Sequence, residues 1–330
     1  MTIAISRRRL ILAMALPTVS TDLLAASTLK LDKPVRIIVS YAAGSGIDQA
    51  ARYVADTMSK LSGQPFIVTN APGADGNIGA ATALRSAEDM YTLLVSGSST
   101  HAANAAIYEK LPFDPERDFT PLSALAYIPF VLLVSPERTK ARTLKEFLSI
   151  SRSGNQDLSF ASPSVGSRIA GEQFKRLTGL NAVNVPYKAS SAAMTDFLGG
   201  RIDYYFCDIA TAPPQVAAGK AVALAVSTKQ RAHRLADVPA LAELGFPDFD
   251  VSSWMAIWSV TKSTPKAISD QLAKAISTEI QSAAGRNFLM EKGYIPALAG
   301  ASELAALQSR DTRIWGEIIR SSGMAQSSQR

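Results

Sequence analysis

Short apolar runs alternate with amphipathic segments along most of the chain. The first run, Val-Arg-Ile-Ile-Val-Ser at 35–40, precedes a segment from Ile47 to Leu61 in which apolar residues recur at helical spacing, with Gly63 just beyond. A second run at 66–69 precedes an amphipathic segment at 78–86, and a third run follows at 92–96. Strands and helices in alternation predict a parallel sheet covered by helices.

The same alternation begins again in the middle of the chain. A long β-like stretch at 122–135 is interrupted at Pro129, and we expect it to form the first crossing between two lobes. Further strands are predicted at 158–161, 182–185, 204–207 and 221–227, with helices at 169–177 and 192–198 between them. A strand at 253–260 would return the chain to the first lobe.

Two helices are predicted near the C-terminus. Thr264 as N-cap and Pro265 at the first helical position would open one helix, and Gly285 would end it. The second would begin at Ser302, with an apolar stripe of Leu304, Leu307, Ile314 and Ile318. We therefore expect an α/β fold with a hinge and a cleft between lobe one, residues 27–128 and 251–330, and lobe two, residues 129–250.

The first 26 residues are typical of an export signal. Arg7, Arg8 and Arg9 precede a short apolar run at 10–16, and the small residues Ala25 and Ala26 follow. The run is too short for a membrane anchor. The arginines also resemble a twin-arginine signal, so both the Sec and the twin-arginine routes stay open. We expect a periplasmic mature protein.

Composition excludes several classes of site. The 330 residues carry a net charge of +6 that is scattered rather than gathered into a stripe, so no nucleic-acid partner is predicted. One cysteine, Cys207, and two histidines exclude an intrachain disulfide and the usual structural zinc site. Walker, dinucleotide and hydrolase-elbow motifs are absent. We predict a protein that is not an enzyme and needs no metal or cofactor.

The loops after the first-lobe strands are the predicted ligand site, because such loops gather at one edge of a parallel sheet. The loop at 43–48 is rich in glycine and precedes a helix, so its N–H groups and the helix N-terminus favour a carboxylate or phosphate. A tight turn with Asp48 only as an N-cap is the alternative, and plain turn chemistry is the alternative for 70–77. The candidates in lobe one are Ala43, Gly44, Ser45, Gly46, Asp48, Gly73, Ala74, Asp75, Ser98 and Thr100.

Lobe two would face these loops with Ser164, Arg168, Tyr187 and Asp208. Tyr187 follows a predicted strand, and it is either a core aromatic or a core aromatic whose hydroxyl reaches the cleft. His101 lies beside Ser98 in a predicted cleft loop, and we expect ligand binding to persist without it.

Six short motifs in one order between residues 34 and 296 resemble the Bug family, the periplasmic receptors of tripartite tricarboxylate transporters. They are 34–52 with Gly44, Asp48, Ala51 and Arg52; Asn-Ala-Pro-Gly-Ala-Asp-Gly at 70–76; Asp-Met-Tyr-Thr-Leu-Leu at 89–94; Val-Pro-Tyr-Lys-Ala at 185–189; Val-Pro at 238–239 with Glu243 and Gly245; and Thr-Pro at 264–265. The resemblance covers nearly the whole mature chain.

The resemblance implies a Venus-flytrap fold of the type II periplasmic-binding-protein class. It also implies that backbone amides and bridging waters hold a ligand carboxylate at 44–48 and 73–76. Two residues depart from the family pattern. Ser45 replaces a glycine, so either the turn differs or the hydroxyl bonds the ligand. Arg168 stands about where many members have histidine, and it either pairs with a second carboxylate or is a solvated first-turn arginine.

We therefore expect a monomeric extracytoplasmic solute-binding protein for a small carboxylate, an organic acid or an amino acid. Its partners would be the membrane subunits of a tripartite tricarboxylate-type transporter. A receptor for a different importer, and a periplasmic sensor that reports carboxylate occupancy to a signalling partner, stay open because both would use the same cleft.

Overall fold

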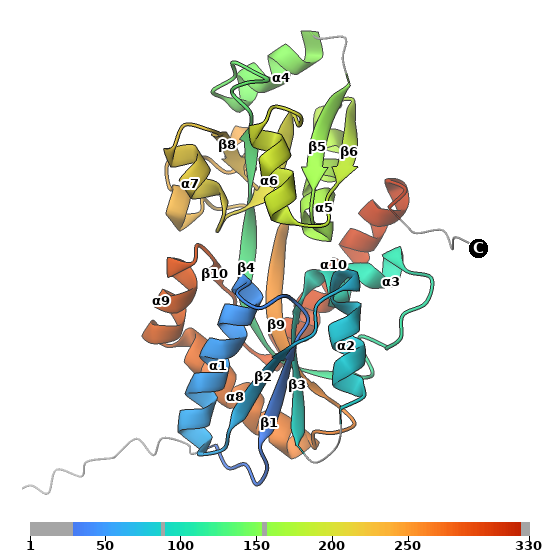
Figure 1. The fold of residues 1–330 in the computed structure, drawn as a ribbon, viewed down its shortest axis with the longest axis vertical. Helices are drawn as coiled ribbons and strands as arrows, with labels where there is room; N and C mark the ends of the chain where they lie inside the picture. The colour runs from blue at the N-terminus through green and yellow to red at the C-terminus, as the bar shows by residue number, and fades with distance from the viewer. Residues whose placement is uncertain (1–28, 87–89, 154–156, 325–330) are drawn as a thin grey trace, which may run out of the picture.

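The computed structural model describes residues 29–86, 90–153 and 157–324 (Figure 1). Two α/β lobes are stacked along the long axis of the molecule, and the long strand β4 extends from one lobe into the other. The two-lobed α/β fold predicted from the alternating pattern is thus confirmed. The predicted export signal, residues 1–26, lies outside the described residues.

Lobe one is built on parallel strands β1 (Val35–Val39), β2 (Phe66–Asn70) and β3 (Tyr91–Gly97), with β1 in the middle. β9 (Ser252–Val260) pairs antiparallel with β3 and with β4 (Phe119–Val134), and β10 (Ile295–Pro296) pairs with β4. The helices that follow β1 and β2 are α1 (Gly46–Ser62) and α2 (Asn77–Leu84). Gly63 ends α1 in the left-handed conformation at φ 71°, as its position predicted.

Lobe two repeats the plan with parallel strands β5 (Leu158–Ser162), β6 (Ala182–Pro186) and β7 (Tyr204–Asp208). Strand β8 (Val222–Val226) and β7 each pair antiparallel with β4. The helices of this lobe are α4 (Leu144–Ser153), α5 (Val165–Thr178), α6 (Ser190–Leu198) and α7 (Ala212–Ala217). All the strands predicted here form, whereas α4 and α7 were not predicted.

Strand β4 connects the lobes because it changes partners along its length. Its residues 119–129 pair with β9, and its residues 130–134 pair with β7. The predicted interruption at Pro129 is wrong. Pro129 has no N–H to donate, but its carbonyl accepts the Ile209 N–H at 3.0 Å, so the strand continues through it. The predicted lobe limits stay a prediction, and this change of partner lies beside the first of them.

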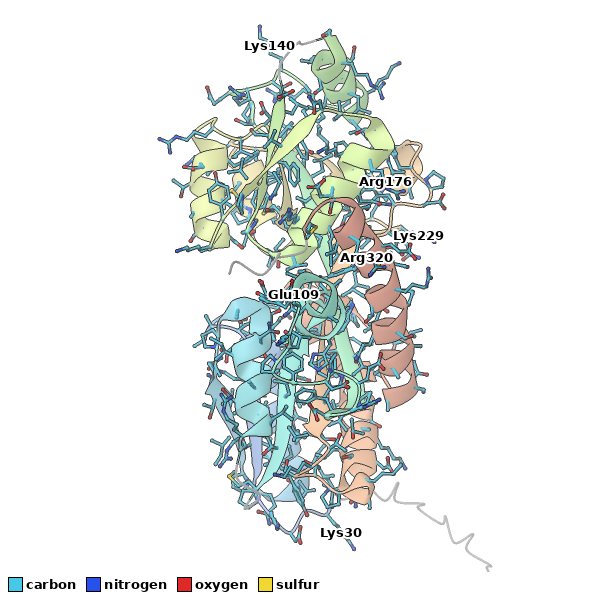
Figure 2. All side chains as sticks on the ribbon, turned by 90° about the vertical axis from the view of Figure 1, so that its right-hand side faces the viewer. Lys30, Glu109, Lys140, Arg176, Lys229 and Arg320 are labelled. Atoms are coloured by element: carbon cyan, nitrogen blue, oxygen red, sulfur yellow. The ribbon has the colours of Figure 1, made fainter. Side chains whose placement is uncertain are left out.

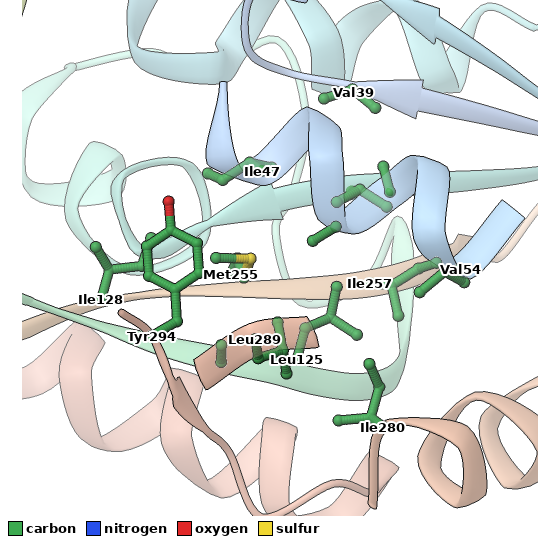
Figure 3. Close-up of a cluster of buried hydrophobic side chains, with 14 of the residues drawn as sticks. Val39, Ile47, Val54, Leu125, Ile128, Met255, Ile257, Ile280, Leu289 and Tyr294 are labelled. Carbon is green, nitrogen blue, oxygen red and sulfur yellow. The ribbon is translucent and has the colours of Figure 1, made fainter. Parts of the chain in front are cut away.

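Apolar packing continues from one lobe to the other beside β4. Ile128, Met255 and Tyr294 lie together in the cluster drawn in Figure 3. The same cluster includes Cys207 and Ile209 of lobe two. Burial raises the pKa of the Cys207 thiol to about 12, so it is the inert buried cysteine that its strand position predicted.

The helix predicted after Thr264 differs from the prediction at both ends. α8 (Lys266–Gln281) begins after Pro265, and the Thr264 hydroxyl donates to the Thr92 carbonyl instead of capping the helix. The chain breaks at Ser282, whose hydroxyl caps a separate helix, α9 (Ala283–Glu291), by accepting the Gly285 N–H at 3.0 Å. Gly285 therefore lies inside α9, where a side chain would overlap the backbone of α8.

The last helix, α10 (Ala301–Ser321), runs along lobe one and reaches lobe two, where Arg320 lies near its end (Figure 2). Its buried residues include Trp315 and Ile319, which belong to the same apolar cluster as Ile169 and Phe174 of α5. Ile314 and Ile318, predicted for the stripe, are only partly buried. The buried positions earlier in the helix include Gln308 and Asp311, which apolar periodicity does not count.

Asp311 and Gln308 accept hydrogen bonds from the indole N–H groups of two tryptophans of β9. Trp254 Nε1 donates to Asp311 Oδ2 at 2.7 Å, and Trp258 Nε1 donates to Gln308 Oε1 at 3.2 Å. Asp311 also accepts from Arg310 Nε at 2.8 Å. α10 is thus fastened to β9 by two buried hydrogen bonds, one of them to a carboxylate.

The substitution Trp254→Phe should lower the free energy of unfolding by about 1–3 kcal/mol, because it leaves a buried carboxylate oxygen of Asp311 without its donor. Trp258→Phe is the matched control and should cost about 1 kcal/mol, since the lost acceptor is neutral. Urea unfolding of both variants measures the difference. Equal losses would show that the charge on Asp311 has no part in the Trp254 contact.

Candidate functional site

The loop between β1 and α1 presents two free N–H groups at the start of a helix. Gly44 has φ 82°, in the left-handed region, whereas Ser45 has φ −65°, which any residue adopts. The Ser45 hydroxyl accepts the Asp48 N–H at 3.2 Å and so caps α1. Between Ser45 and Asp48 lie the N–H groups of Gly46 and Ile47. Within the described part of the chain, neither of these two groups has an acceptor. Ser45 is therefore compatible with the turn.

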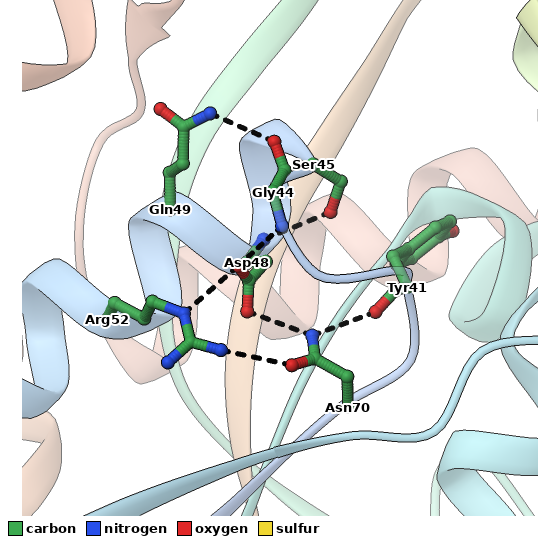
Figure 4. A network of polar contacts seen from close by, with 7 residues as sticks. All are labelled: Tyr41, Gly44, Ser45, Asp48, Gln49, Arg52 and Asn70. Carbon is green, nitrogen blue, oxygen red and sulfur yellow. Dashed lines mark hydrogen bonds and ion pairs between the residues drawn. The ribbon is translucent and has the colours of Figure 1, made fainter.

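Asp48 joins this loop to the next one (Figure 4). Its carboxylate accepts the Gly44 N–H at 2.8 Å, Arg52 Nε at 3.0 Å and Asn70 Nδ2 at 2.8 Å. Asn70 Nδ2 also donates to the Tyr41 carbonyl, and Asn70 Oδ1 accepts from Arg52. A carboxylate is needed here because three donors converge on it.

The protonation of Asp48 follows from these contacts. Burial raises its pKa, but hydrogen bonds from Arg52, the Gly44 N–H and Asn70 outweigh burial and hold the pKa below its ordinary value. Asp48 is therefore ionised at neutral pH with both oxygens occupied. This geometry assigns it a positioning role, and its predicted contact with the ligand stays a prediction.

The loop after β2 is held in an unusual backbone conformation. Residues 73–76 all have positive φ, including the two non-glycine residues Ala74 at 47° and Asp75 at 51°. The Asp75 carbonyl accepts Thr100 Oγ1 at 3.0 Å and Asn104 Nδ2 at 3.1 Å, which holds the loop in place. Such backbone strain concentrates at functional sites. Among the described residues, none accepts the N–H of Ala74 or Asp75.

Ser98 and Thr100, predicted as a polar rim, are buried behind these loops. Ser98 Oγ lies 2.7 Å from Ser253 Oγ, and Thr100 accepts from Ser96 while it donates to the Asp75 carbonyl. Gly76 is required beside them, because a side chain at its φ of 91° would overlap the Thr100 hydroxyl. The Thr100 hydroxyl therefore supports the loop from within, whereas the Ser98 hydroxyl bonds to β9.

His101 is part of the core, not of the cleft rim. It belongs to the π-helix η2 (Ser99–Ala103), and its ring stacks on Trp258 with centroids 3.8 Å apart. Burial lowers its pKa to about 3, so the imidazole is neutral.

The second lobe brings three predicted residues to one small pocket of about 180 Å³. Ser164, Arg168 and Tyr187 line it from α5 and the end of β6, and Asp75 lines it from lobe one. Ser164 caps α5 by accepting the Ser167 N–H, and the Tyr187 hydroxyl donates to Asp196 at 3.0 Å. The pocket therefore lies between the lobes, next to the loop of residues 73–76.

Asp208 stands apart from that pocket, beside the start of α1. It ends β7, and its carboxylate accepts the Ala210 N–H at 2.7 Å. Burial raises its pKa to about 6. Its charge acts on Tyr294, whose hydroxyl occupies the space where a side chain on Gly46 would lie. Of the predicted lobe-two residues, Ser164, Arg168 and Tyr187 thus lie together in one pocket, and Asp208 lies elsewhere.

Sequence reasoning missed three residues that shape the site. Asn70 opens the motif at 70–76 and could have been found as a side chain able to bond both neighbouring loops. Burial raises the pKa of Tyr41, whose phenol faces Ser99 and Thr100. Tyr294 reaches Gly46 from the turn between α9 and β10, and no local pattern in the sequence indicates a contact between residues so far apart in the chain.

Comparison with known proteins identifies the family. Residues 50–324 match the family described as the tripartite tricarboxylate transporter family receptor. The chain belongs to this receptor family. The receptor is 30% identical to BugT of Bordetella pertussis over 88% of this chain and 90% of the relative. It is 32% identical to a UPF0065 protein of Agrobacterium vitis over 87% of this chain and 82% of the relative.

Solved structures confirm the Venus-flytrap fold of the receptor. An R. palustris protein with adipate has a TM-score of 0.79 at 26% identity and covers 89% of this chain and 98% of its own. MatC from Rhodopseudomonas palustris with bound malate has a TM-score of 0.73 at 28% identity, with coverage of 87% and 99%. The periplasmic binding protein BugD has a TM-score of 0.75 at 25% identity, with coverage of 90% and 100%.

The family is one of binding proteins rather than enzymes, which confirms the prediction that the receptor is not an enzyme. Over the described ranges, no helix has both the length and the apolar character needed to cross a membrane. Nor do the described residues contain a group of His, Cys, Asp or Glu able to hold a metal ion.

Replacing Asp48 by Ala should lower the free energy of unfolding by about 2–4 kcal/mol, since three donors lose a shared buried acceptor. Asp56→Ala on the same helix is the matched control. Its pair with Lys60 is exposed, so the loss should be below about 0.5 kcal/mol. Chemical unfolding measures both variants. An Asp48→Ala variant as stable as the control would exclude the positioning role.

Asp208 should make stability depend on pH. Its folded pKa of about 6 lies above the ordinary 3.8, so the fold favours the protonated form. Stability should therefore fall as pH rises from about 4 through 6, by on the order of 1 kcal/mol for this partly exposed group. The difference in free energy of unfolding between wild type and Asp208→Asn, measured at each pH, isolates the effect. A pH-independent difference between the two proteins would contradict the raised pKa.

Proposed function

We propose that this receptor captures a small carboxylate in the periplasm and delivers it to the membrane subunits of a tripartite tricarboxylate-type transporter. The observation that carries the proposal is the set of open N–H groups at Gly46, Ile47, Ala74 and Asp75. Two come from a helix N-terminus and two from a strained loop, and both arrangements favour an anion.

Three further observations support it. Related structures hold adipate and malate, both carboxylates. The family description names a tricarboxylate transporter receptor. The sequence begins with a stretch typical of an export signal, which agrees with a periplasmic location.

The mechanism that we propose is capture followed by lobe closure. A carboxylate bound to the first-lobe loops would gain contacts from lobe two only when the cleft closes, and these contacts supply the free energy that favours the closed state. The closed monomer would then dock on its membrane partner. Backbone donors recognise the carboxylate and not the carbon skeleton, so such a site would accept carboxylates of different skeletons.

Thermal unfolding of the mature receptor, refolded free of metabolites, tests the binding. A panel of mono-, di- and tricarboxylates is compared with the corresponding amides. A ligand at about 100 times its dissociation constant adds roughly 2.7 kcal/mol. For a chain of this size that corresponds to about 2–4 °C or less. A shift with a carboxylate and none with its amide is expected. Equal shifts with both, or none with any compound, would refute an anion site.

A further inference from the structure

Arg168 has a buried nitrogen with nothing to bond. It lies in the first turn of α5, where its own N–H donates to the Ser164 carbonyl at 3.0 Å. Its Nε is buried and has no hydrogen-bond partner, while the side chain lines the pocket between the lobes. A partly buried guanidinium without an acceptor is costly, because arginine keeps its charge at any ordinary pH. An anion bound in this pocket would supply the acceptor that the guanidinium lacks.

The acidic residues around Arg168 already have other partners. Glu172, one turn further along α5, lies 3.9 Å from Lys175. Asp196 accepts from the Tyr187 hydroxyl and from Arg201 at 2.7 Å. Burial lowers the pKa of Arg168, and the charge of Glu172 offsets this only in part. Among the described residues, neither carboxylate forms a hydrogen bond or an ion pair with Arg168.

Asp75 is the one carboxylate among the described residues that line the pocket, and it comes from the other lobe. It accepts from the Tyr108 hydroxyl at 3.0 Å. Its charge opposes a bound anion in the same pocket, so it would weaken such binding rather than assist it. A ligand anion and an Asp75–Arg168 pair are thus distinct alternatives with opposite consequences for Asp75 variants.

The dimensions of the pocket limit what can bind. Its volume of about 180 Å³ is below the roughly 300–1,000 Å³ of sites that enclose a drug-sized ligand. It has room for one small end group, such as a carboxylate, and not for a bulky ring. The loop that contributes Asp75 to this pocket also carries the N–H groups of Ala74 and Asp75, which no described residue accepts, so these donors lie beside the pocket.

We propose that Arg168 determines ligand specificity by binding a second negatively charged group at the lobe-two end of the ligand. This inference rests on the proposed carboxylate function. The first carboxylate binds the N–H groups of lobe one, and the second pairs with the guanidinium through charge-assisted hydrogen bonds. The receptor thereby prefers dianions to monoanions of the same length.

Titration calorimetry of the full mature chain tests this preference with two matched probe pairs. Succinate is compared with succinamate, and adipate with monomethyl adipate, so that each pair differs in one charge. Wild type should bind the dianion of at least one pair about 10–100-fold more tightly, as expected for a hydrogen bond to a charged group. Arg168→Gln should abolish that ratio by weakening dianion binding far more than monoanion binding, whereas Arg168→Lys should restore part of it.

Two controls separate the alternatives. Arg176→Gln removes an exposed arginine of the same helix, bonded to Gln173, and should leave every affinity unchanged. Asp75→Asn should tighten dianion binding, because it removes a like charge. If Asp75→Asn and Arg168→Gln weaken all four probes equally, the two residues pair with each other and the inference is wrong. Thermal unfolding without ligand confirms that each variant is folded.

Failure of this inference differs from failure of the proposed function. Carboxylates that bind with a dianion preference unaffected by Arg168→Gln would overturn the role of Arg168 alone. Folded wild type that binds none of the four probes, nor any carboxylate of the thermal panel, would overturn both.

Discussion

The carboxylate of Asp48 holds the candidate site together. It is the shared acceptor for a backbone N–H of the first loop, a side chain of α1 and the amide of Asn70 at the start of the second loop. It adds to the direct hydrogen bond from Asn70 to the Tyr41 carbonyl, so the two loops share a charged anchor as well as a neutral one. The N–H groups of Gly46 and Ile47 are available because Asp48 and Ser45 satisfy their neighbours. An acidic residue can thus support the proposed anion site, since its own charge is already compensated by three donors.

Around this anchor, buried contacts link the lobes in two ways. The apolar cluster that contains Tyr294 continues from α1 to the end of β7. α10 adds a second link, from the tryptophans of β9 to the face of α5. Lobe two therefore presents Arg168 and Asp208 to the loops of lobe one across these contacts, at two different places along the interface.

Local patterns predicted the elements well wherever the apolar period and the positions of glycine indicate the same element. The strands of both lobes, α1 with its Gly63 stop and the order of the loops follow from apolar period and from glycine, and their positions were correct. The loops that carry free N–H groups could also be named from their glycines. Each of these features depends on residues that are close in the sequence.

Other features depend on partners that are distant in the chain. Pro129 reads as a break, yet Ile209 supplies a donor that keeps the strand paired. Asp311 is polar, so apolar periodicity does not predict it as a buried position. It is buried because the Trp254 indole N–H donates to its carboxylate. The sequence pattern predicts Asp48 as a ligand contact or a simple N-cap. Its contact with Asn70, which links the two loops, is visible only in the structure. The sequence contains these residues but not their pairings, so periodicity alone could not predict them.

The path of strand β4 determines whether the two lobes can be separated or unfold independently. Because one continuous strand belongs to the sheets of both lobes, and Trp315 and Ile319 of the last helix complete the core of lobe two, neither lobe contains all of its own interior. A fragment cut at the lobe limits would expose apolar surface and an unpaired sheet edge, which promote aggregation. The two lobes are therefore one cooperative unit in folding, although the proposed mechanism moves them relative to each other around a ligand.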